Sequence, residues 1–526
     1  MLDGSMQDYA LTLDRFLRHA AKWHPRAELV TAQADGGTTR TTYAALMQRS
    51  LAVTGLLAGM GVGRGDRVAT LAWNSQAHVE AWYAIMGMGA VCHTLNPRLT
   101  AAQLAAMLDQ SQARILIASA DLLRLVRQVL DRSPRIGRVL VIDGDIGGPG
   151  DPRLSVLSPD PAMAVPADAW GGFAETAPSG LCFTSGTTGA PKGVTYTHRS
   201  GFLHTLRLLQ ADVMAISGRD AVLTMVPMFH ANAWGLPFAV PAVGARLVLP
   251  GRQADGASLA RLIAAEGVTI GVGVPTVWLG LVEHLEATGE RLPSLRRIIV
   301  GGSPLPPALM ERIEERLGVT VQTSWGMTEL SPCGTMAPPD DPDRRAAVSG
   351  RPAIGADLLL TDADGRPLPD QRGAEGHLRV RGAAVIDRYF GQEQKATDAR
   401  GWFPTGDLAR IDADGNLLIT GRAKDLIKSG GEWINPAEIE ALIGALPEVS
   451  LAAVIGRTHP KWGERPLLLV EMRAGATLDD AALLAPLKGR VAPWWVPDAV
   501  IRLPAMPLAP TGKIDKISLR VQYGED

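Results

Sequence analysis

The sequence contains very few cysteines. Only three of its 526 residues are cysteine, Cys92, Cys182 and Cys333, and they are far apart in the chain. No C-x-x-C pair occurs, so the spacing argues against a disulfide framework and against a zinc site. We therefore expect three packed thiols in a protein from a reducing compartment.

An excess of charge of either sign is also lacking. The chain has 52 Lys and Arg against 54 Asp and Glu, which gives a formal net charge of −2. This balance is unlike the basic stripe of a nucleic-acid-binding protein and unlike a polybasic membrane anchor. We expect a small-molecule partner and no nucleic acid.

Long hydrophobic runs are absent as well. The longest apolar stretch, around residues 81–92, is short and broken by glycine, whereas the hydrocarbon core of a membrane is ~30 Å thick. The first six residues show neither the basic nor the apolar region of a signal peptide, and the last six match no targeting or lipidation motif. We expect a cytoplasmic protein without an integral membrane segment.

The length and the hydrophobic pattern predict an α/β protein with more than one domain. A chain of 526 residues exceeds the usual domain size of ~50–250 residues. Helical spacing alternates with short apolar runs typical of buried strands. The helical stretches include residues 13–23, 43–60 and 479–490, and the strand-sized runs include 67–72, 114–118, 221–226, 246–249, 268–274 and 297–300. The last hundred or so residues are the size of a small separate domain.

One glycine- and hydroxyl-rich stretch, residues 183–193, follows a strand-sized apolar run. Its glycines let backbone N–H groups approach an anion, and its hydroxyls and one cation are further donors. The residues concerned are Thr184, Ser185, Gly186, Thr187, Thr188, Gly189, Lys192 and Gly193. The spacing is not that of a Walker loop. The stretch predicts a phosphate site, with a flexible surface turn as the alternative.

Two further strand ends carry residues suited to a nucleotide. Gly301, Gly302 and Ser303 follow the run at 297–300, and small residues at a strand end let a flat ligand lie against the backbone. Residues 325–329 place an aromatic ring, a hydroxyl and a carboxylate together, which can stack a base, bind phosphate and hold Mg²⁺. Burial of Trp325 in the core and solvation of Glu329 are the alternatives.

Five stretches in this order resemble the acyl-adenylate-forming superfamily of acyl-CoA synthetases, adenylation domains and luciferases. They are residues 184–193, 325–329, 402–407, 421–425 and 510–516. The resemblance covers nearly the whole chain. Trp325, in place of the more usual Tyr, and residues 429–434 are most similar to bacterial medium- and long-chain fatty-acyl-CoA synthetases and methylmercaptopropionate-CoA ligases.

The resemblance implies a site for ATP and Mg²⁺. The loop at 184–193 encloses the β- and γ-phosphates, Thr328 binds the α-phosphate, and Glu329 with Thr187 holds Mg²⁺. Adenine lies between the Gly301–Ser303 stretch and Trp325, next to Gly326 and Met327. Asp407 and Arg422 hold the ribose hydroxyls. An ATP-dependent acid–CoA ligase that forms AMP and pyrophosphate is the implied activity.

The resemblance also assigns roles to the end of the chain. Residues 1–421 form a large N-terminal domain of stacked α/β sheets, and residues 422–526 form a small, mobile α+β domain. Lys513 bridges carboxylate and α-phosphate during adenylation, and Lys424 is the hinge. A channel for coenzyme A involves Lys428, Ser429, Gly430, Gly431, Glu432 and Trp433. For the two glycines a plain turn is the alternative.

The acyl pocket is placed by resemblance at residues 228–234. His230 lies near the reacting carboxylate, although a structural histidine fits the sequence equally well. The expected apolar walls are Phe229, Trp234, Val300 and Leu330, with Met327 beside them. They supply no cation for a second carboxylate, so we expect an apolar or aromatic monocarboxylic acid.

Other chemistries have less support in the sequence. No Gly-x-Ser-x-Gly or His-Glu-x-x-His motif is present, which disfavours a hydrolase or a metalloprotease. An enzyme that loads a carrier protein remains an alternative, because it shares the first half-reaction. A luciferase-like oxygenase shares it too, and a non-catalytic nucleotide sensor is disfavoured by the intact Lys513, Glu329 and Asp407. A homodimer is left open.

Overall fold

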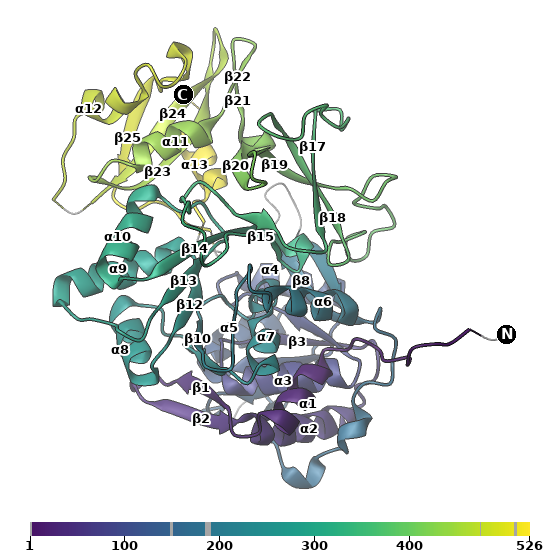
Figure 1. The fold of residues 1–526 in the computed structure, drawn as a ribbon. Helices are drawn as coiled ribbons and strands as arrows, with labels where there is room; N and C mark the ends of the chain where they lie inside the picture. The colour runs from purple at the N-terminus through teal and green to yellow at the C-terminus, as the bar shows by residue number, and fades with distance from the viewer. Residues whose placement is uncertain (1–2, 148–150, 185–190, 474, 510–512, 526) are drawn as a thin grey trace.

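The computed structural model describes residues 3–147, 151–184, 191–473, 475–509 and 513–525. Figure 1 shows a large part built on two extended sheets, with a smaller C-terminal part, drawn in yellow-green and yellow, beside one end of it. The prediction of an α/β fold with a C-terminal α+β part is confirmed. The boundary between residues 421 and 422 stays a prediction.

The first large sheet has nine strands in the order β16-β15-β14-β13-β12-β10-β11-β1-β2. Its six central strands run parallel, and β2, β15 and β16 are antiparallel additions. The strands are β1 (Glu28–Ala32), β2 (Thr38–Thr42), β10 (Ala221–Thr224), β11 (Arg246–Leu249), β12 (Ile270–Gly273), β13 (Arg297–Val300), β14 (Thr320–Gly326), β15 (Cys333–Met336) and β16 (Arg351–Pro352). The carboxyl ends of β10, β13 and β14 therefore meet at one edge, where ligands bind in open α/β sheets.

The second large sheet has seven strands in the order β7-β6-β5-β3-β4-β8-β9, and only β9 is antiparallel. The strands are β3 (Arg67–Leu71), β4 (Val91–Thr94), β5 (Ile115–Ser119), β6 (Arg138–Ile142), β7 (Leu154–Val156), β8 (Pro178–Thr184) and β9 (Lys192–Thr197). The phosphate-loop stretch connects β8 to β9, so the predicted strand before it is confirmed.

Helices lie between the two sheets and on their outer faces. The largest apolar core joins both sheets through α1 (Asp14–Trp23), α2 (Tyr43–Gly59), α3 (Gln76–Gly87) and α7 (Leu236–Ala242). The outer helices of the nine-stranded sheet are α8 (Gly256–Glu266), α9 (Pro275–Thr288) and α10 (Pro307–Leu317). Those of the seven-stranded sheet are α4 (Ala101–Ser111) and α5 (Leu123–Leu130). Helix α6 (His198–Leu208) follows β9.

Two smaller sheets complete the fold. A four-stranded antiparallel sheet contains β17 (Ala356–Thr361), β18 (Glu375–Gly382), β19 (Phe403–Ile411) and β20 (Leu417–Arg422). The C-terminal sheet contains β21 (Ile427–Ser429), β22 (Glu432–Ile434), β23 (Val449–His459), β24 (Gly463–Met472) and β25 (Ala499–Leu503). Its helices are α11 (Pro436–Gly444), α12 (Asp480–Leu484) and α13 (Lys516–Tyr523).

One predicted helix is shorter than expected. The pattern at 479–490 predicted a continuous helix, but α12 ends at Leu484 and a 3₁₀ turn over Ala485–Leu487 follows. Pro486 has no N–H for an i→i−4 bond and its ring obstructs the preceding turn, so the α-helix stops before it.

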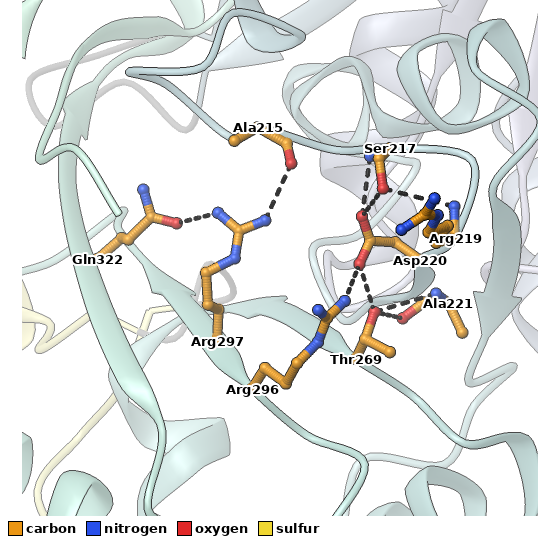
Figure 2. Close-up of polar contacts among 9 residues, drawn as sticks. All are labelled: Ala215, Ser217, Arg219, Asp220, Ala221, Thr269, Arg296, Arg297 and Gln322. Carbon is orange, nitrogen blue, oxygen red and sulfur yellow. Dashed lines mark hydrogen bonds and ion pairs between the residues drawn. The ribbon is translucent and has the colours of Figure 1, made fainter. Parts of the chain in front are cut away.

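Asp220 ties together the starts of the central strands. Its carboxylate accepts hydrogen bonds from Ser217 and Thr269 and pairs with Arg296 at 2.6 Å (Figure 2). Arg297 lies beside this group and donates to Gln322 on β14. The network fixes β10, β12 and β13 at their amino ends. It thereby helps to set the positions of the residues that follow the carboxyl ends of these strands.

No helix in the described ranges is long and apolar enough to cross a membrane.

Candidate active site

The two ends of the predicted phosphate loop are paired strands. Thr184 is opposite Lys192, and Phe183 is opposite Gly193. A Cβ atom on Gly193 would lie 2.9 Å from that of Phe390, so this position requires glycine. The roles expected for Ser185, Gly186, Thr187, Thr188 and Gly189 stay predictions, because residues 185–190 lie outside the described ranges.

Glu329, the predicted metal ligand, lies in a 3₁₀ turn directly after β14. Its residue surface is only 8% exposed, and burial raises the pKa of the carboxyl group. A hydrogen bond from Tyr389 and the charges of Arg422 and Lys192 oppose that rise. The Tyr389 hydroxyl donates to Oε1 at 3.0 Å. The carboxylate is thus held from one side and faces the cations of the site.

The turn around Thr328 and Glu329 is held by its backbone. The Tyr196 hydroxyl donates to the Thr328 carbonyl at 2.9 Å. Cys333, four residues after Glu329, binds two side chains of α6. Its N–H donates to His204 Nε2 at 3.2 Å, and Arg207 donates to its carbonyl at 2.8 Å. Because these partners are buried, the turn has little freedom to move.

The predicted ribose-binding carboxylate is buried and held by two partners. Asp407 Oδ2 accepts from the Trp325 indole at 2.9 Å, and Oδ1 pairs with Arg422 at 2.7 Å. Burial raises the pKa of Asp407, while Arg422 and Trp325 oppose the rise. Trp325 is 8% exposed, with its ring edge against Gly334. The structure therefore brings together three of the predicted nucleotide-binding residues.

Lys513 joins this cluster from the C-terminal part. Its charge acts on Asp407 and His230, and it is itself influenced by Arg422, Asp407 and Glu329. Removal of water by the surrounding protein lowers the pKa of Lys513, and the positive charge of Arg422 lowers it further. The residue nevertheless keeps an exposed surface. The predicted adenylation lysine and the predicted metal ligand thus share one electrostatic environment.

The chain after His230 forms a left-handed turn. Residues 231–235 all have positive φ, with values of 44°, 52°, 46°, 53° and 78°. For a residue other than glycine this conformation costs ~1–2 kcal/mol, so the surrounding packing must hold it. Its last non-glycine residue, Trp234, lies against Gly301 and Gly302, where a Cβ on Gly301 would be 2.9 Å from the ring. The turn therefore brings Trp234, a predicted acyl-pocket residue, to the predicted adenine wall.

His230 is half-buried, and burial lowers its pKa to about 4, with the charge of Lys513 acting in the same direction. The imidazole is therefore neutral near pH 7. It can donate or accept a hydrogen bond but does not provide a positive charge for a carboxylate.

The other predicted pocket residues lie in different apolar clusters. Leu330 packs with Trp325 and Tyr196, whereas Val300 packs with Trp278 and its neighbours, among the outer helices of the nine-stranded sheet. Phe229 is buried, and its ring contacts Trp73 edge to face. Their shared role as acyl-pocket walls stays a prediction.

The predicted coenzyme A channel is a hairpin in the C-terminal part. Strands β21 and β22 are joined by Gly430 and Gly431, whose φ values are +59° and +94°. Trp433 is 54% exposed and the Lys428 ammonium lies 5.4 Å from its ring. Figure 1 shows this hairpin apart from β14 and β15. Ser429 is buried and Glu432 is exposed beside it.

Sequence reasoning missed Tyr389. It lies in an irregular segment between β18 and β19, where no periodicity marks a side chain as functional. The Phe390 N–H donates to the Gly193 carbonyl on β9 and so brings this segment to the end of the phosphate loop. A contact of that kind leaves no signal in one sequence.

The family comparisons agree with this geometry. Residues 16–390 match the model of the AMP-binding enzyme, and residues 438–513 match the AMP-binding enzyme C-terminal domain. The chain belongs to the AMP-binding enzyme family. The prediction of an AMP-forming acyl-CoA ligase is confirmed at the level of the reaction.

Relatives with similar sequences share the full length of the chain. It is 40% identical to a 3-methylmercaptopropionyl-CoA ligase of Ruegeria lacuscaerulensis, covering 99% of this chain and 98% of that one. It is 38% identical to a medium-chain-fatty-acid–CoA ligase of Ectopseudomonas oleovorans, with 99% and 98% covered. It is 40% identical to a long-chain-fatty-acid–CoA ligase of Thermus thermophilus, with 99% and 97% covered.

Solved structures share the fold. An anthranilate CoA ligase in complex with anthranoyl-AMP superposes with a TM-score of 0.86 at 25% identity, covering 98% of this chain and 99% of the other. The ATP-bound MatB of Rhodopseudomonas palustris gives 0.84 at 27% identity, with 98% and 99% covered.

Proposed function

We propose that this ligase activates a medium- or long-chain fatty acid, or a similarly apolar monocarboxylic acid, and transfers it to coenzyme A. The observation that carries the proposal is the meeting of Lys513, Glu329, Asp407 and Arg422 in one electrostatic cluster. Two cations and two buried carboxylates together suit a nucleotide whose α-phosphate reacts with a carboxylate.

In the first half-reaction, an oxygen of the acid attacks the α-phosphorus and the bond to the β-phosphate breaks. Negative charge grows on the phosphoryl oxygens, and a cation fixed beforehand stabilises it. Lys513 supplies this charge. Lys192, at the start of β9, holds the departing pyrophosphate, and Asp407 with Arg422 fixes the ribose so that the phosphorus is correctly placed.

The residues present fit a magnesium ion. Glu329 offers a carboxylate, the ligand type that Mg²⁺ prefers. Of its two oxygens, only Oε1 accepts a hydrogen bond from a side chain in the described part of the chain. When bound, the ion would neutralise phosphate charge and strengthen pyrophosphate as a leaving group. Thr187 would be a further ligand.

The second half-reaction needs a thiol at the acyl carbonyl. With Lys513 near Asp407, the β21–β22 hairpin lies apart from the site. We infer that the C-terminal part rotates about Lys424, which removes Lys513 from the site and brings in the β21–β22 hairpin. Gly430 and Gly431 then form the wall of the pantetheine channel. A Lys424→Pro variant should keep adenylation and lose thioester formation. If its thioester formation matches the wild-type rate, Lys424 is not the hinge.

The nature of the acid is inferred from the pocket and from the relatives. The predicted walls Phe229, Trp234, Val300 and Leu330 are apolar, and His230 is neutral near pH 7. Relatives act on methylmercaptopropionate and on medium- and long-chain fatty acids, according to their names. These acids share one carboxylate and an apolar remainder, which fits such walls.

A pyrophosphate-release screen tests this proposal. The panel holds straight-chain acids of graded length with thioether-containing, arylalkanoic, branched and dicarboxylic acids, and each is assayed with and without coenzyme A. We expect apolar monocarboxylic acids to be preferred. Preference for a dicarboxylic acid would contradict the proposal. A pantetheinylated carrier protein as acceptor tests the alternative of carrier loading, which would be supported if it replaced free coenzyme A.

We also propose a cytoplasmic location, in keeping with three cysteines that are all free and buried. A homodimer is tested by light scattering of the purified chain.

A further inference from the structure

The segment formed by residues 384–390 joins the two loops on which adenylation depends; we call it the bridge segment. Near its start, the Ile386 N–H donates to the Glu329 carbonyl at 2.9 Å. At its end, the Phe390 N–H donates to the Gly193 carbonyl at 2.8 Å. One short stretch thus fixes the turn that carries Glu329 relative to the strand that carries Lys192.

One side chain of the bridge segment contacts both functional groups. The Tyr389 hydroxyl donates to Glu329 Oε1 at 3.0 Å. The Lys192 ammonium lies 5.0 Å from the centroid of the Tyr389 ring, within the range in which an aromatic face attracts a cation. Tyr389 therefore lies between the predicted pyrophosphate cation and the predicted metal carboxylate.

Packing alone accounts for the ring but not for the hydroxyl. Tyr389 packs beside the cluster that contains Trp325 and Leu330, and a phenylalanine would pack in the same way. A phenol is a donor, and an ionised carboxylate can only accept. A phenol is protonated near neutral pH, so the Tyr389 hydroxyl keeps the proton that it donates to Glu329.

We propose that Tyr389 is a positioning residue for adenylation, whose hydroxyl orients the Glu329 carboxylate toward the metal ion and whose ring holds Lys192 facing the same space. This inference rests on the proposed roles of Glu329 and Lys192. Its consequence is coupling: the metal ion and the nucleotide phosphates bind cooperatively, because one side chain sets the distance between their protein ligands.

Two variants separate the two contacts of Tyr389. Tyr389→Phe removes one oxygen atom and keeps the ring near Lys192, whereas Tyr389→Leu removes both contacts. The measurement is calorimetric binding of ATP to the full chain with and without Mg²⁺, in the absence of any acid, so that no turnover occurs. The readout is the factor by which Mg²⁺ tightens ATP binding.

We expect Tyr389→Phe to reduce that factor about tenfold, as for the loss of one hydrogen bond to a charged group, and to leave ATP binding without Mg²⁺ near the wild-type value. Tyr389→Leu should also weaken ATP binding without Mg²⁺ a few-fold, because the contact with Lys192 is lost. The matched controls are Tyr9→Phe and Tyr9→Leu, since Tyr9 is 60% exposed and lies under Arg15. Both controls should bind ATP as the wild type does.

An unchanged Mg²⁺ factor in Tyr389→Phe would overturn the proposal. If ATP affinity then falls equally with and without Mg²⁺, the hydroxyl has a structural role only. If Tyr389→Leu does not fold, Tyr389→Phe decides alone. A wild-type chain whose ATP binding does not respond to Mg²⁺ would instead contradict the proposed metal role of Glu329.

Discussion

The indole N–H of Trp325 donates to Oδ2 of Asp407 at 2.9 Å, while Oδ1 of the same carboxylate pairs with Arg422 at 2.7 Å. Each oxygen thus has its own partner, one from the nine-stranded sheet and one from the end of β20. The carboxylate that we expect to bind the ribose is therefore oriented before any nucleotide arrives. A tyrosine at this position would have no indole N–H to make this bond.

Replacing Trp325 by phenylalanine should weaken ATP binding. The variant keeps an aromatic ring but leaves Oδ2 of Asp407 without its donor, and loss of such a bond costs ~1.5–3 kcal/mol. Because Arg422 still holds the other oxygen, we expect the lower end of that range, a rise of about tenfold in KM for ATP. Initial rates of pyrophosphate release measure it. Trp23→Phe, at a side chain 63% exposed on α1, is the control; equal KM values in both variants would contradict this role.

The pH dependence of adenylation follows from three shifted groups. Burial raises the pKa of Glu329 and of Asp407, so both carboxylates gain protons at a higher pH than ordinary acids do. The surrounding protein lowers the pKa of Lys513, so its charge is lost at a lower pH than in a free lysine. On their proposed roles, the carboxylates must be ionised and the lysine charged for activity, so activity should fall on both sides of a narrowed pH plateau.

A Lys513→Arg variant distinguishes the acid limb of the pH–activity profile from the alkaline limb, because a guanidinium stays charged. Its alkaline limb should move to higher pH while its acid limb stays in place. No limb should follow His230, whose pKa of about 4 keeps it neutral across the plateau. An alkaline limb that is identical in the arginine variant would assign it to another group.

Asp220 should matter for stability and not for the chemistry. Burial alone would raise its pKa, but hydrogen bonds from Ser217 and Thr269 and the charge of Arg296 outweigh it and place the pKa below its usual range. Asp220→Ala removes the carboxylate that accepts from Arg296 and from Thr269, and leaves the Thr269 hydroxyl to donate over the longer bond to the Ala221 carbonyl (Figure 2). We expect a loss of about 2–3 kcal/mol in the free energy of unfolding, measured by urea denaturation.

The pH dependence of that loss has a definite sign. A carboxyl group with a lowered pKa stabilises the fold above its unfolded value, near ~4, and the stabilisation disappears as the pH falls through the folded value. The wild type should therefore lose stability below about pH 4 more steeply than Asp220→Asn. If the free energy of unfolding fell with pH in parallel for the two proteins, the ionised form of Asp220 would not be what stabilises the fold.

The sequence predicted the elements that carry the site better than the contacts within it. The end of β8 at Thr184 and the end of β13 at Val300 follow from apolar runs that stop at small or polar residues. Which residues of other elements lie beside these strand ends does not follow from the sequence, because it depends on pairing between distant segments. Helix α12 shows the opposite case: helical spacing continued to residue 490, and a single proline ended the helix at Leu484.

Two features of the site could not be predicted from the sequence for physical reasons. The left-handed turn at residues 231–235 opposes the backbone preference of each of its non-glycine residues, so only tertiary packing selects it. The contact of Tyr389 with Glu329 joins segments that are 60 residues apart in the chain. Local pattern carries no information on either feature.

The central claim is that Lys513 serves the first half-reaction alone. The most direct measurement is single-turnover kinetics of Lys513→Ala in both half-reactions, with ATP and acid for the first, and with supplied acyl-adenylate and coenzyme A for the second. We expect adenylate formation to fall by ~10²–10³-fold, as when one contact to a developing charge is removed, and thioester formation to stay near the wild-type rate. An equal fall in both half-reactions would contradict the account.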